Sequence, residues 1–347
     1  MRSSLTQFAK EEALRLGFIL AGVTSPDPPP HWSTYNNWLV KGRNAGMSYL
    51  ATERSLQRRA DPLHILPECQ SILVLGFLYP QPLPLNEGRE QDPVGRIAAY
   101  ACGQDYHLVL PGLMLTLVNS LQRRLGFAFP YRCHTDSGPI LERDLAQRAG
   151  LGWIGRNTCL INPRHGSYIL LAEIMLGIDL DLDPPFEKNH CGSCMLCIQA
   201  CPTGCILPDR TLDSNRCISF LSIENKTLIP VELRSAMGNW VFGCDICQVV
   251  CPWNRFAVKG NVNLLKKEHL NGHPNLLEEL SLTSKEFNQK YGDTALMRAR
   301  RSRYLRNVIV AFANSGYPGD ISLLKKLVND PDPLVREHAA WAVASWK

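Results

Sequence analysis

The chain has 347 residues, of which 45% are apolar, and a formal net charge of +5 at pH 7. This length predicts two or three domains with real hydrophobic cores. The mild positive charge permits a nucleic-acid partner without indicating one, and the absence of a run of 18 or more apolar residues argues against a membrane span.

The apolar run at 16–23 near the N-terminus follows charged residues and lacks a small-residue cleavage site. It predicts a helix that runs into a strand and does not resemble a signal peptide. We therefore expect a cytoplasmic protein with no membrane association.

Residues 1–183 alternate between helical and strand-like patterns. In chain order they predict a buried strand at 71–78, a helix at 111–125, a helix at 137–149 that ends before Gly150, a strand at 168–174 and an acidic, Pro-rich linker at 179–185.

Nine of the thirteen cysteines lie between Cys191 and Cys251. In a reducing cytosol, cysteines gathered in this way bind metals or carry out redox chemistry and rarely form disulfides. The clustering predicts one cofactor-bearing segment at 184–258.

The spacing within this segment is that of a bacterial ferredoxin. Its first run is Cys191-x2-Cys194-x2-Cys197-x3-Cys201-Pro202. In such a run the fourth cysteine binds a second cluster, so a partner run is expected. The second run is Cys244-x2-Cys247-x3-Cys251-Pro252, with Cys217 as the candidate for its displaced first ligand.

The crossed pattern assigns the ligands of two [4Fe–4S] clusters. The first takes Cys191, Cys194, Cys197 and Cys251, and the second takes Cys217, Cys244, Cys247 and Cys201. Cys205 is left over and is expected to be a small buried side chain. Two zinc sites are the alternative, because CxxC pairs also bind Zn²⁺.

Residues 259–347 turn helical. Two segments about 30 residues apart resemble each other, 304–311 and 334–341, and the second follows Asp330-Pro-Asp-Pro. The pattern resembles a HEAT-like helical repeat with about two copies, which suits a docking module.

A long string, Thr135-Asp-Ser-Gly-Pro-Ile-Leu-Glu-Arg-Asp-Leu-Ala-Gln-Arg-Ala-Gly-Leu-Gly-Trp-Ile-Gly-Arg-Asn-Thr, is more specific than the cysteine motif. Together with Gly103-Gln-Asp-Tyr-His, the short motifs at 166–168 and 172–174, the cysteine runs and Arg216-Cys-Ile-Ser-Phe-Leu, it resembles the epoxyqueuosine reductase family over nearly the whole chain.

The resemblance implies an α+β protein with three parts. They are a nitroreductase-like, cobalamin-binding α/β domain at 1–183, a ferredoxin-like domain with two [4Fe–4S] clusters at 184–258, and a HEAT-like tRNA-docking domain at 259–347. It also implies the last step of queuosine synthesis, in which the epoxide of epoxyqueuosine at the tRNA wobble position is reduced to an alkene.

Asp136 is the catalytic candidate that the resemblance implies. Opening the epoxide places negative charge on oxygen, so a positioned acid would lower the barrier. Burial beside an apolar corrin predicts a raised pKa that keeps Asp136 protonated. From the residues alone, a helix cap before Pro139 is the alternative.

The same matching nominates cobalamin-contacting residues, with Asp136 facing the cobalt: Arg59, Ala98, Asp136, Leu160, Leu171, Ser219 and Asp245. Ser219 and Asp245 lie beside second-cluster ligands, so this cluster is expected to adjoin the corrin. Leu160 and Leu171 have ordinary core positions as the alternative. Asp105, Tyr106 and His107 either line the pocket or form a helix N-terminus, with His107 at the surface and unassigned to cobalt.

Candidate tRNA contacts are basic residues at the entry to the repeat and in the preceding segment: Lys226, Arg298, Arg300, Arg301, Arg303 and, in the same run, Arg306. An ordinary solvated face is the alternative for such a charge run.

Three rival functions remain open at this stage. A reductive dehalogenase also pairs cobalamin with two clusters, an electron-transfer or scaffold protein needs only the clusters, and a structural zinc protein could bind RNA. We expect an external electron donor and a monomer.

Overall fold

The computed structural model describes residues 2–82, 93–257 and 272–346. Its centre is a four-stranded antiparallel sheet in the order β1 (Leu20–Thr24), β2 (Ser71–Leu78), β7 (Ile169–Leu176) and β4 (Tyr131–His134). Every residue of β2 is buried, which confirms the strand predicted at 71–78. β7 likewise confirms the strand predicted at 168–174, shifted by one residue at its start.

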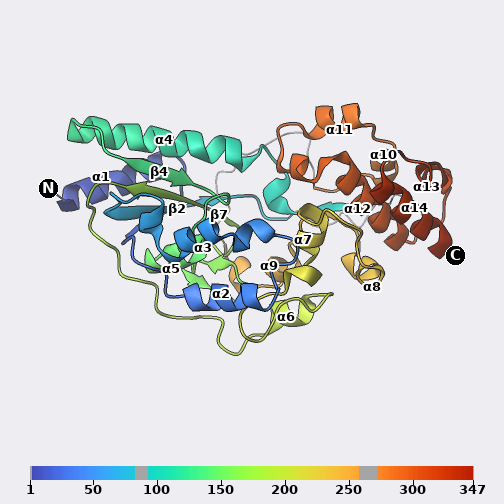
Figure 1. Cartoon of the computed structure of the whole chain (residues 1–347), viewed down its shortest axis with the longest axis horizontal. Coiled ribbons are helices and arrows are strands. Elements are labelled where there is room, and N and C mark those ends of the chain that lie inside the picture. Colours follow the sequence, from blue (N-terminus) through green and yellow to red (C-terminus); the bar gives the residue numbers. More distant parts are fainter. Residues whose placement is uncertain (1, 83–92, 258–271, 347) are drawn as a thin grey trace.

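Both faces of the sheet are covered by helices. Because side chains alternate along a strand, β2 contributes to a separate core on each face. Leu73, Leu75 and Phe77 point into a core shared with α1 (Arg2–Arg15) and α4 (Tyr106–Leu125). Ile72 and Val74 point into a second core with α5 (Glu142–Arg148). Figure 1 shows α4 and α1 on one side of the sheet, and α5, α2 (Trp32–Val40) and α3 (Glu53–Ala60) on the other.

Two predicted helices have different starts from those expected. α4 begins at Tyr106 and not at Pro111, because the Asp105 side chain accepts the His107 N–H at 3.0 Å and caps the helix. Pro111 therefore lies inside the helix. α5 begins at Glu142, several residues later than predicted, and the preceding residues form a turn; Gly150, with φ +76°, follows its end.

The cysteine-rich segment contains short elements: α6 (Leu196–Ala200), α7 (Ile218–Ile223), α8 (Val231–Arg234), β8 (Trp240–Phe242) and α9 (Ile246–Val249). α6 packs against α9. β8 pairs in parallel with β3 (Arg96–Ile97), and β5 (Trp153–Ile154) pairs with β6 (Leu160–Ile161). The segment is thus tied to the first third of the chain by a shared pair of strands.

The C-terminal helices are α10 (Leu276–Leu280), α11 (Ser284–Tyr291), α12 (Arg300–Asn314), α13 (Ser322–Leu327) and α14 (Pro333–Ser345). The two repeat-like segments lie on α12 and α14, which pack together at the right of Figure 1. Their core also includes Ile97, Val241 and Phe242. The predicted boundary at 258/259 lies outside the described residues. Within the described part of the chain, no helix is long and apolar enough to cross a bilayer.

Candidate active site and cluster-binding segment

The four thiols predicted to bind the first cluster line one cavity of about 290 Å³. They are Cys191, Cys194, Cys197 and Cys251. Cys251 reaches this cavity from the second cysteine run, as the crossed pattern requires, because α6 and α9 pack side by side. The donor set and the space both fit a [4Fe–4S] cluster.

Aromatic side chains surround this cavity. The Trp153 indole N–H donates to the Cys191 sulfur at 3.4 Å, and Trp153 lies edge-on to His190 and Trp253, each with ring centroids 5.0 Å away. Hydrogen bonds to ligand sulfurs and a largely apolar wall are the levers by which a protein tunes a cluster potential.

The second thiol group lies around Cys205. The Cys201 and Cys205 sulfurs are 3.5 Å apart, and Cys205 also interacts with the Cys217 thiol. Cys217 and Cys201 lie close enough to Cys244 to raise the pKa of its thiol, and Cys244 and Cys217 do the same to Cys247. Cys205 is 4% exposed, so its predicted burial is confirmed, although it touches two thiols and is not surrounded by apolar groups alone.

The thiol spacing bears on the zinc alternative. Zn–S bonds of about 2.3 Å draw four sulfurs tightly around one ion, whereas a cubane holds each sulfur on a different iron. Over residues 2–82, 93–257 and 272–346, no three Cys, His, Asp or Glu side chains converge closely enough to hold a single metal ion. What favours clusters over zinc is the crossed geometry, in which Cys251 of the second run joins the three thiols of the first.

Asp136 lies in a tight turn between β4 and α5. Its φ is +57°, and the Ser137 N–H donates to the Thr135 carbonyl at 2.6 Å across it. The Thr135 hydroxyl donates to the Leu171 carbonyl at 2.7 Å and fastens the turn to β7. Because α5 begins at Glu142 with Leu141 as its N-cap residue, the helix-cap interpretation of Asp136 is wrong.

The Asp136 carboxylate is the meeting point of three distant segments. Its Oδ2 accepts from the Tyr106 hydroxyl at 2.9 Å and from Arg298 Nη1 at 3.1 Å, and lies 3.4 Å from His107 Nε2. His107 Nδ1 lies 2.7 Å from Asp105 Oδ1. The side chain of Asp136 is still 46% exposed, so one side of it is open to a substrate.

These contacts set the protonation states. Desolvation raises the pKa of Asp136, but the ion pair with His107, the charge of Arg298 and the Tyr106 hydroxyl outweigh it and lower the pKa to about 2. Desolvation lowers the pKa of His107, but the hydrogen bond with Asp105 and the ion pair with Asp136 raise it to about 9. The predicted raised pKa of Asp136 is wrong for this arrangement, because two cations face the carboxylate. At neutral pH Asp136 is therefore ionised and the His107 imidazole carries a proton. The His107 side chain is 19% exposed, so the alternative that placed it at the surface is wrong.

Two of the residues predicted to contact cobalamin, Arg59 and Asp245, lie in neighbouring parts of the structure. Arg59, 9% exposed, donates to the Gly138 carbonyl at 3.4 Å, beside the Asp136 turn. Asp245, 1% exposed, accepts the Ala99 N–H at 2.7 Å, beside the second thiol group. Half-buried Tyr100 follows Ala99, which donates to Asp245, and its ring lies 6.1 Å from that of Tyr106, which donates to Asp136. Asp136 and Asp245 therefore lie in one region.

The remaining nominees differ in exposure. Ala98 and Leu160 are 1% and 4% exposed and pack in apolar cores. Leu171 is partly buried against the core that holds Leu160, and Ser219 is partly exposed on α7. The side chains of Ala98 and Leu160 thus lie in the hydrophobic core. For Leu160 this is the alternative to a cobalamin contact that the sequence had left open.

Three of the arginines predicted to contact tRNA already make contacts or are buried within the protein. Arg301 makes a two-point ion pair with Asp330, at 2.9 and 3.4 Å. Arg303 donates to the carbonyls of Ile223 and Ala299, at 2.8 and 2.9 Å. Arg306 is fully buried, so the suggestion that it contacts RNA is wrong.

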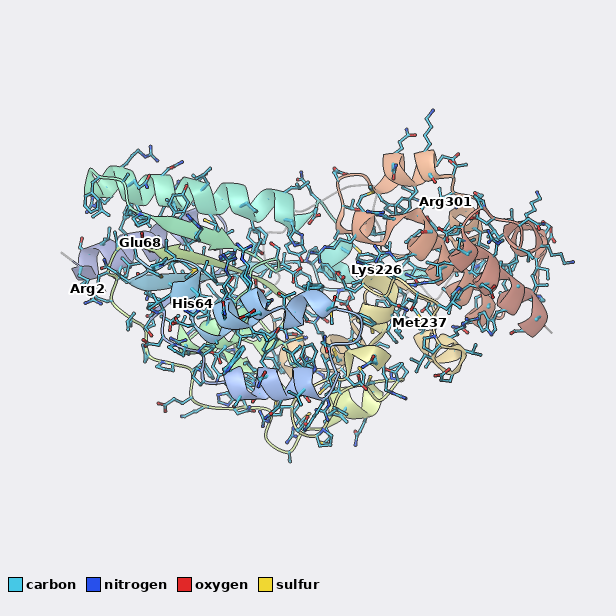
Figure 2. The ribbon with its side chains drawn as sticks, viewed as in Figure 1. Arg2, His64, Glu68, Lys226, Met237 and Arg301 are labelled. Atoms are coloured by element: carbon cyan, nitrogen blue, oxygen red, sulfur yellow. The ribbon has the colours of Figure 1, made fainter. Side chains whose placement is uncertain are left out.

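The other basic candidates remain accessible. Lys226 and Arg300 are exposed, and Figure 2 shows Lys226 near the junction between the C-terminal helices and the rest of the molecule. Arg298 is partly exposed but points at Asp136, a role that its place in a charge run did not predict. Sequence reasoning also missed Glu142, which accepts the Asp136 N–H.

Comparisons with known proteins agree with this arrangement. Residues 59–137 match a family model described as "Epoxyqueuosine reductase QueG, DUF1730", and residues 190–254 match one described as "4Fe-4S double cluster binding domain". The chain is 36% identical to epoxyqueuosine reductase of Pseudomonas aeruginosa, over 98% of this chain and 94% of that protein.

Two solved structures are similar over 99% of this chain and 90% of their own, each at 29% identity. One is an epoxyqueuosine reductase with a tRNA-Tyr epoxyqueuosine-modified stem loop, at a TM-score of 0.89. The other is epoxyqueuosine reductase from Bacillus subtilis with its catalytic loop swung out of the active site, at 0.86.

Proposed function

Because this chain belongs to the epoxyqueuosine reductase family, we propose that it reduces the epoxide of epoxyqueuosine in the anticodon of tRNA to the alkene of queuosine. The observation that carries the proposal is the Asp136 carboxylate, open on one side and held by Tyr106, His107 and Arg298. A relative of 29% identity is solved with a tRNA stem loop that carries this modification.

The reaction removes one oxygen atom as water and therefore needs two electrons and two protons. Two [4Fe–4S] clusters deliver electrons singly, which suits the double-cluster match at 190–254 and the two thiol groups. The proposed ligands are those of the crossed assignment: Cys191, Cys194, Cys197 and Cys251, and Cys217, Cys244, Cys247 and Cys201.

Cobalamin is the proposed second cofactor, and when bound it supplies a reduced, strongly nucleophilic cobalt centre. The fit rests on the region between Asp136 and Asp245, where Arg59, Ser219 and Leu171 offer polar and apolar contacts. The side chains of Ala98 and Leu160 are already packed, so a contact of either residue with cobalamin would have to use its backbone.

The protons are proposed to come from the groups around Asp136. Asp136 faces the epoxide oxygen and passes on a proton that it receives from His107, which holds one at neutral pH. Tyr106 and Arg298 orient the carboxylate and stabilise negative charge as the C–O bond opens.

We assign a nitroreductase-like cobalamin domain to residues 1–183, the ferredoxin-like domain to 184–258 and a HEAT-like tRNA-docking domain to 259–347. Support for the last is the packing of α12 on α14. Accessible Lys226 and Arg300 are the proposed phosphate contacts, with Arg298 near the modified base. Arg301 and Arg303 act indirectly, by holding the docking helices in place. An external electron donor, a monomeric state and a cytoplasmic location complete the proposal.

The decisive experiment is anaerobic reconstitution with iron, sulfide and cobalamin, followed by a strong reductant and tRNA that carries epoxyqueuosine. Mass analysis of the digested nucleosides should show loss of one oxygen, dependent on cobalamin and abolished in Asp136→Asn. Asp209→Asn, which alters an exposed acid paired with Arg43, is the matched control. Assembly of both cofactors with an unchanged nucleoside would overturn the proposed substrate and favour a dehalogenase-like reaction, whereas clusters without corrin uptake would favour an electron carrier.

A further inference from the structure

Two acidic side chains behind Asp136 have no part in the proposed reaction. Glu142 is the first residue of α5, and Glu173 lies in the middle of β7. Glu173 is 0% exposed, and neither of its carboxyl oxygens has a hydrogen-bond donor among the described residues. A buried carboxylate without a donor is costly when ionised, so Glu173 must hold its own proton or share one.

The group that faces Glu173 is the carboxyl of Glu142. Burial raises the pKa of Glu173, and the negative charge of the Glu142 carboxyl raises it further. Burial likewise raises the pKa of Glu142, to about 7, together with the charge of Asp136. Two carboxyls in such contact share one proton, because both cannot be ionised.

Other charged groups around the pair act in both directions. Arg143 on α5 and Arg59 on α3 favour ionised Glu142, and the negative charge of Asp136 opposes it. His134 lies opposite Glu173 in the β4–β7 pairing, and it is neutral because burial lowers its pKa to about 4. In the described part of the chain, no cation therefore takes the place of the shared proton on Glu173.

Glu142 is also bonded to the turn that presents Asp136. Its Oε1 accepts the Asp136 N–H at 2.5 Å. Asp136 has a left-handed backbone with a φ of +57°, which L-residues seldom adopt, so the turn needs outside support. A hydrogen bond from a backbone N–H to an ionised carboxylate is among the stronger kinds available for this.

We propose that Glu142 is a positioning residue that holds Asp136 in this turn, and that Glu173 is the protonated partner that keeps Glu142 ionised. Glu142 then accepts two hydrogen bonds, one from the Asp136 N–H and one from the Glu173 hydroxyl. The Asp136 carboxylate is thereby kept within reach of Tyr106, His107 and Arg298. The consequence for the reaction rests on the proposed role of Asp136 as the acid.

The first test compares Glu142→Ala with Glu142→Gln in the reconstituted full-length protein. Alanine removes the acceptor, so the Asp136 amide should lose protection from hydrogen exchange and kcat should fall about 100-fold, with KM for tRNA little changed. Glutamine retains an acceptor oxygen and should restore most of both. Asp144→Asn is the matched control, because Asp144 is a buried acid of α5 that contacts His31 and not the Asp136 turn.

The second test varies the partner and the pH. Glu173→Gln can still donate to Glu142 and should preserve kcat, whereas Glu173→Leu cannot and should lower it. In wild type, protection of the Asp136 amide, corrected for intrinsic exchange, should increase from about pH 6 to about pH 8 as Glu142 ionises. Glu142→Gln should lose this dependence.

Retained kcat and amide protection in Glu142→Ala would overturn the positioning role. So would a pH dependence that persists in Glu142→Gln. If wild type fails to convert the nucleoside, the proposed function fails, but hydrogen exchange still decides whether Glu142 holds the turn. Thermal unfolding of each variant separates loss of the turn from loss of the fold.

Discussion

Arg298 Nη1 donates to Asp136 Oδ2 at 3.1 Å across 162 positions of sequence. This bond joins the helical C-terminal part of the chain to the turn beside the central sheet. A residue at the entry to the proposed docking module therefore also sets the charge state of the proposed acid. Docking of tRNA and proton transfer would share one side chain.

The pH dependence of the reaction should report His107. Its pKa is raised to about 9, so the imidazolium persists at neutral pH and is lost as pH rises through that value. The kcat of wild type is expected to decline through about pH 9, and His107→Gln should lose that alkaline limb along with much of its activity. Tyr106→Phe, which retains His107, should still show the decline of kcat near pH 9. If His107→Gln shows the same decline, another group is responsible for it.

Stability should follow the same group with a defined sign. A histidine whose pKa is raised by folding stabilises the fold most fully below its unfolded value of about 6.5, and that contribution is lost as pH rises through about 9. The midpoint of thermal unfolding should therefore fall less steeply between these pH values in His107→Gln than in wild type.

Arg300 should contribute affinity for tRNA without affecting chemistry. It is exposed at the start of α12, and no hydrogen bond of its side chain is found among the described residues. Arg300→Ala is expected to raise KM for tRNA, leave kcat unchanged and reduce the slope of log affinity against log salt by about 1. Lys285→Ala, which alters a lysine on α11, is the matched control, and equal salt slopes for wild type and Arg300→Ala would remove Arg300 from the interface.

Arg301 should matter for stability. Its ion pair with Asp330 is well shielded, with side-chain exposures of 19% and 4%. Arg301→Ala leaves a buried carboxylate unpaired and is expected to lower the free energy of unfolding by about 3 kcal/mol. Denaturant unfolding of the reconstituted protein measures this, and Asp330→Asn in the same background should recover part of the loss.

The cysteine assignment predicts different outcomes for two neighbouring thiols. Cys217→Ala should halve the iron content, because it removes a ligand of the second cluster. Cys205→Ala should retain both clusters, although Cys205 lies 3.5 Å from the Cys201 sulfur. Iron and sulfide analysis with electron paramagnetic resonance distinguishes the two, and loss of a cluster in Cys205→Ala would place Cys205 in the ligand set.

Some of this architecture follows from local sequence. The strand at 71–78 was predictable because a continuous apolar run of that length has no stable place except inside a sheet covered on both faces. The cysteine spacing predicted that Cys251 would join Cys191, since the crossed geometry is a property of the motif itself. Helix starts were less predictable: the Asp105 cap overrode Pro111 as the start of α4.

The Asp136 site was decided by tertiary structure. Its residue type and its neighbours in sequence suggested an acid that burial would keep protonated. In the fold its pKa is lowered by His107 and Arg298, which come from other segments. The arginine run shows the same limit. Its side chains became a cation paired with Asp136, an exposed charge, a member of a buried ion pair and a packed core group. The sequence by itself determined which chemistry was available, through residue types at fixed local spacing. Charge states and accessibility depend on distances of a few ångströms between segments far apart in the chain, and only the tertiary structure decides these.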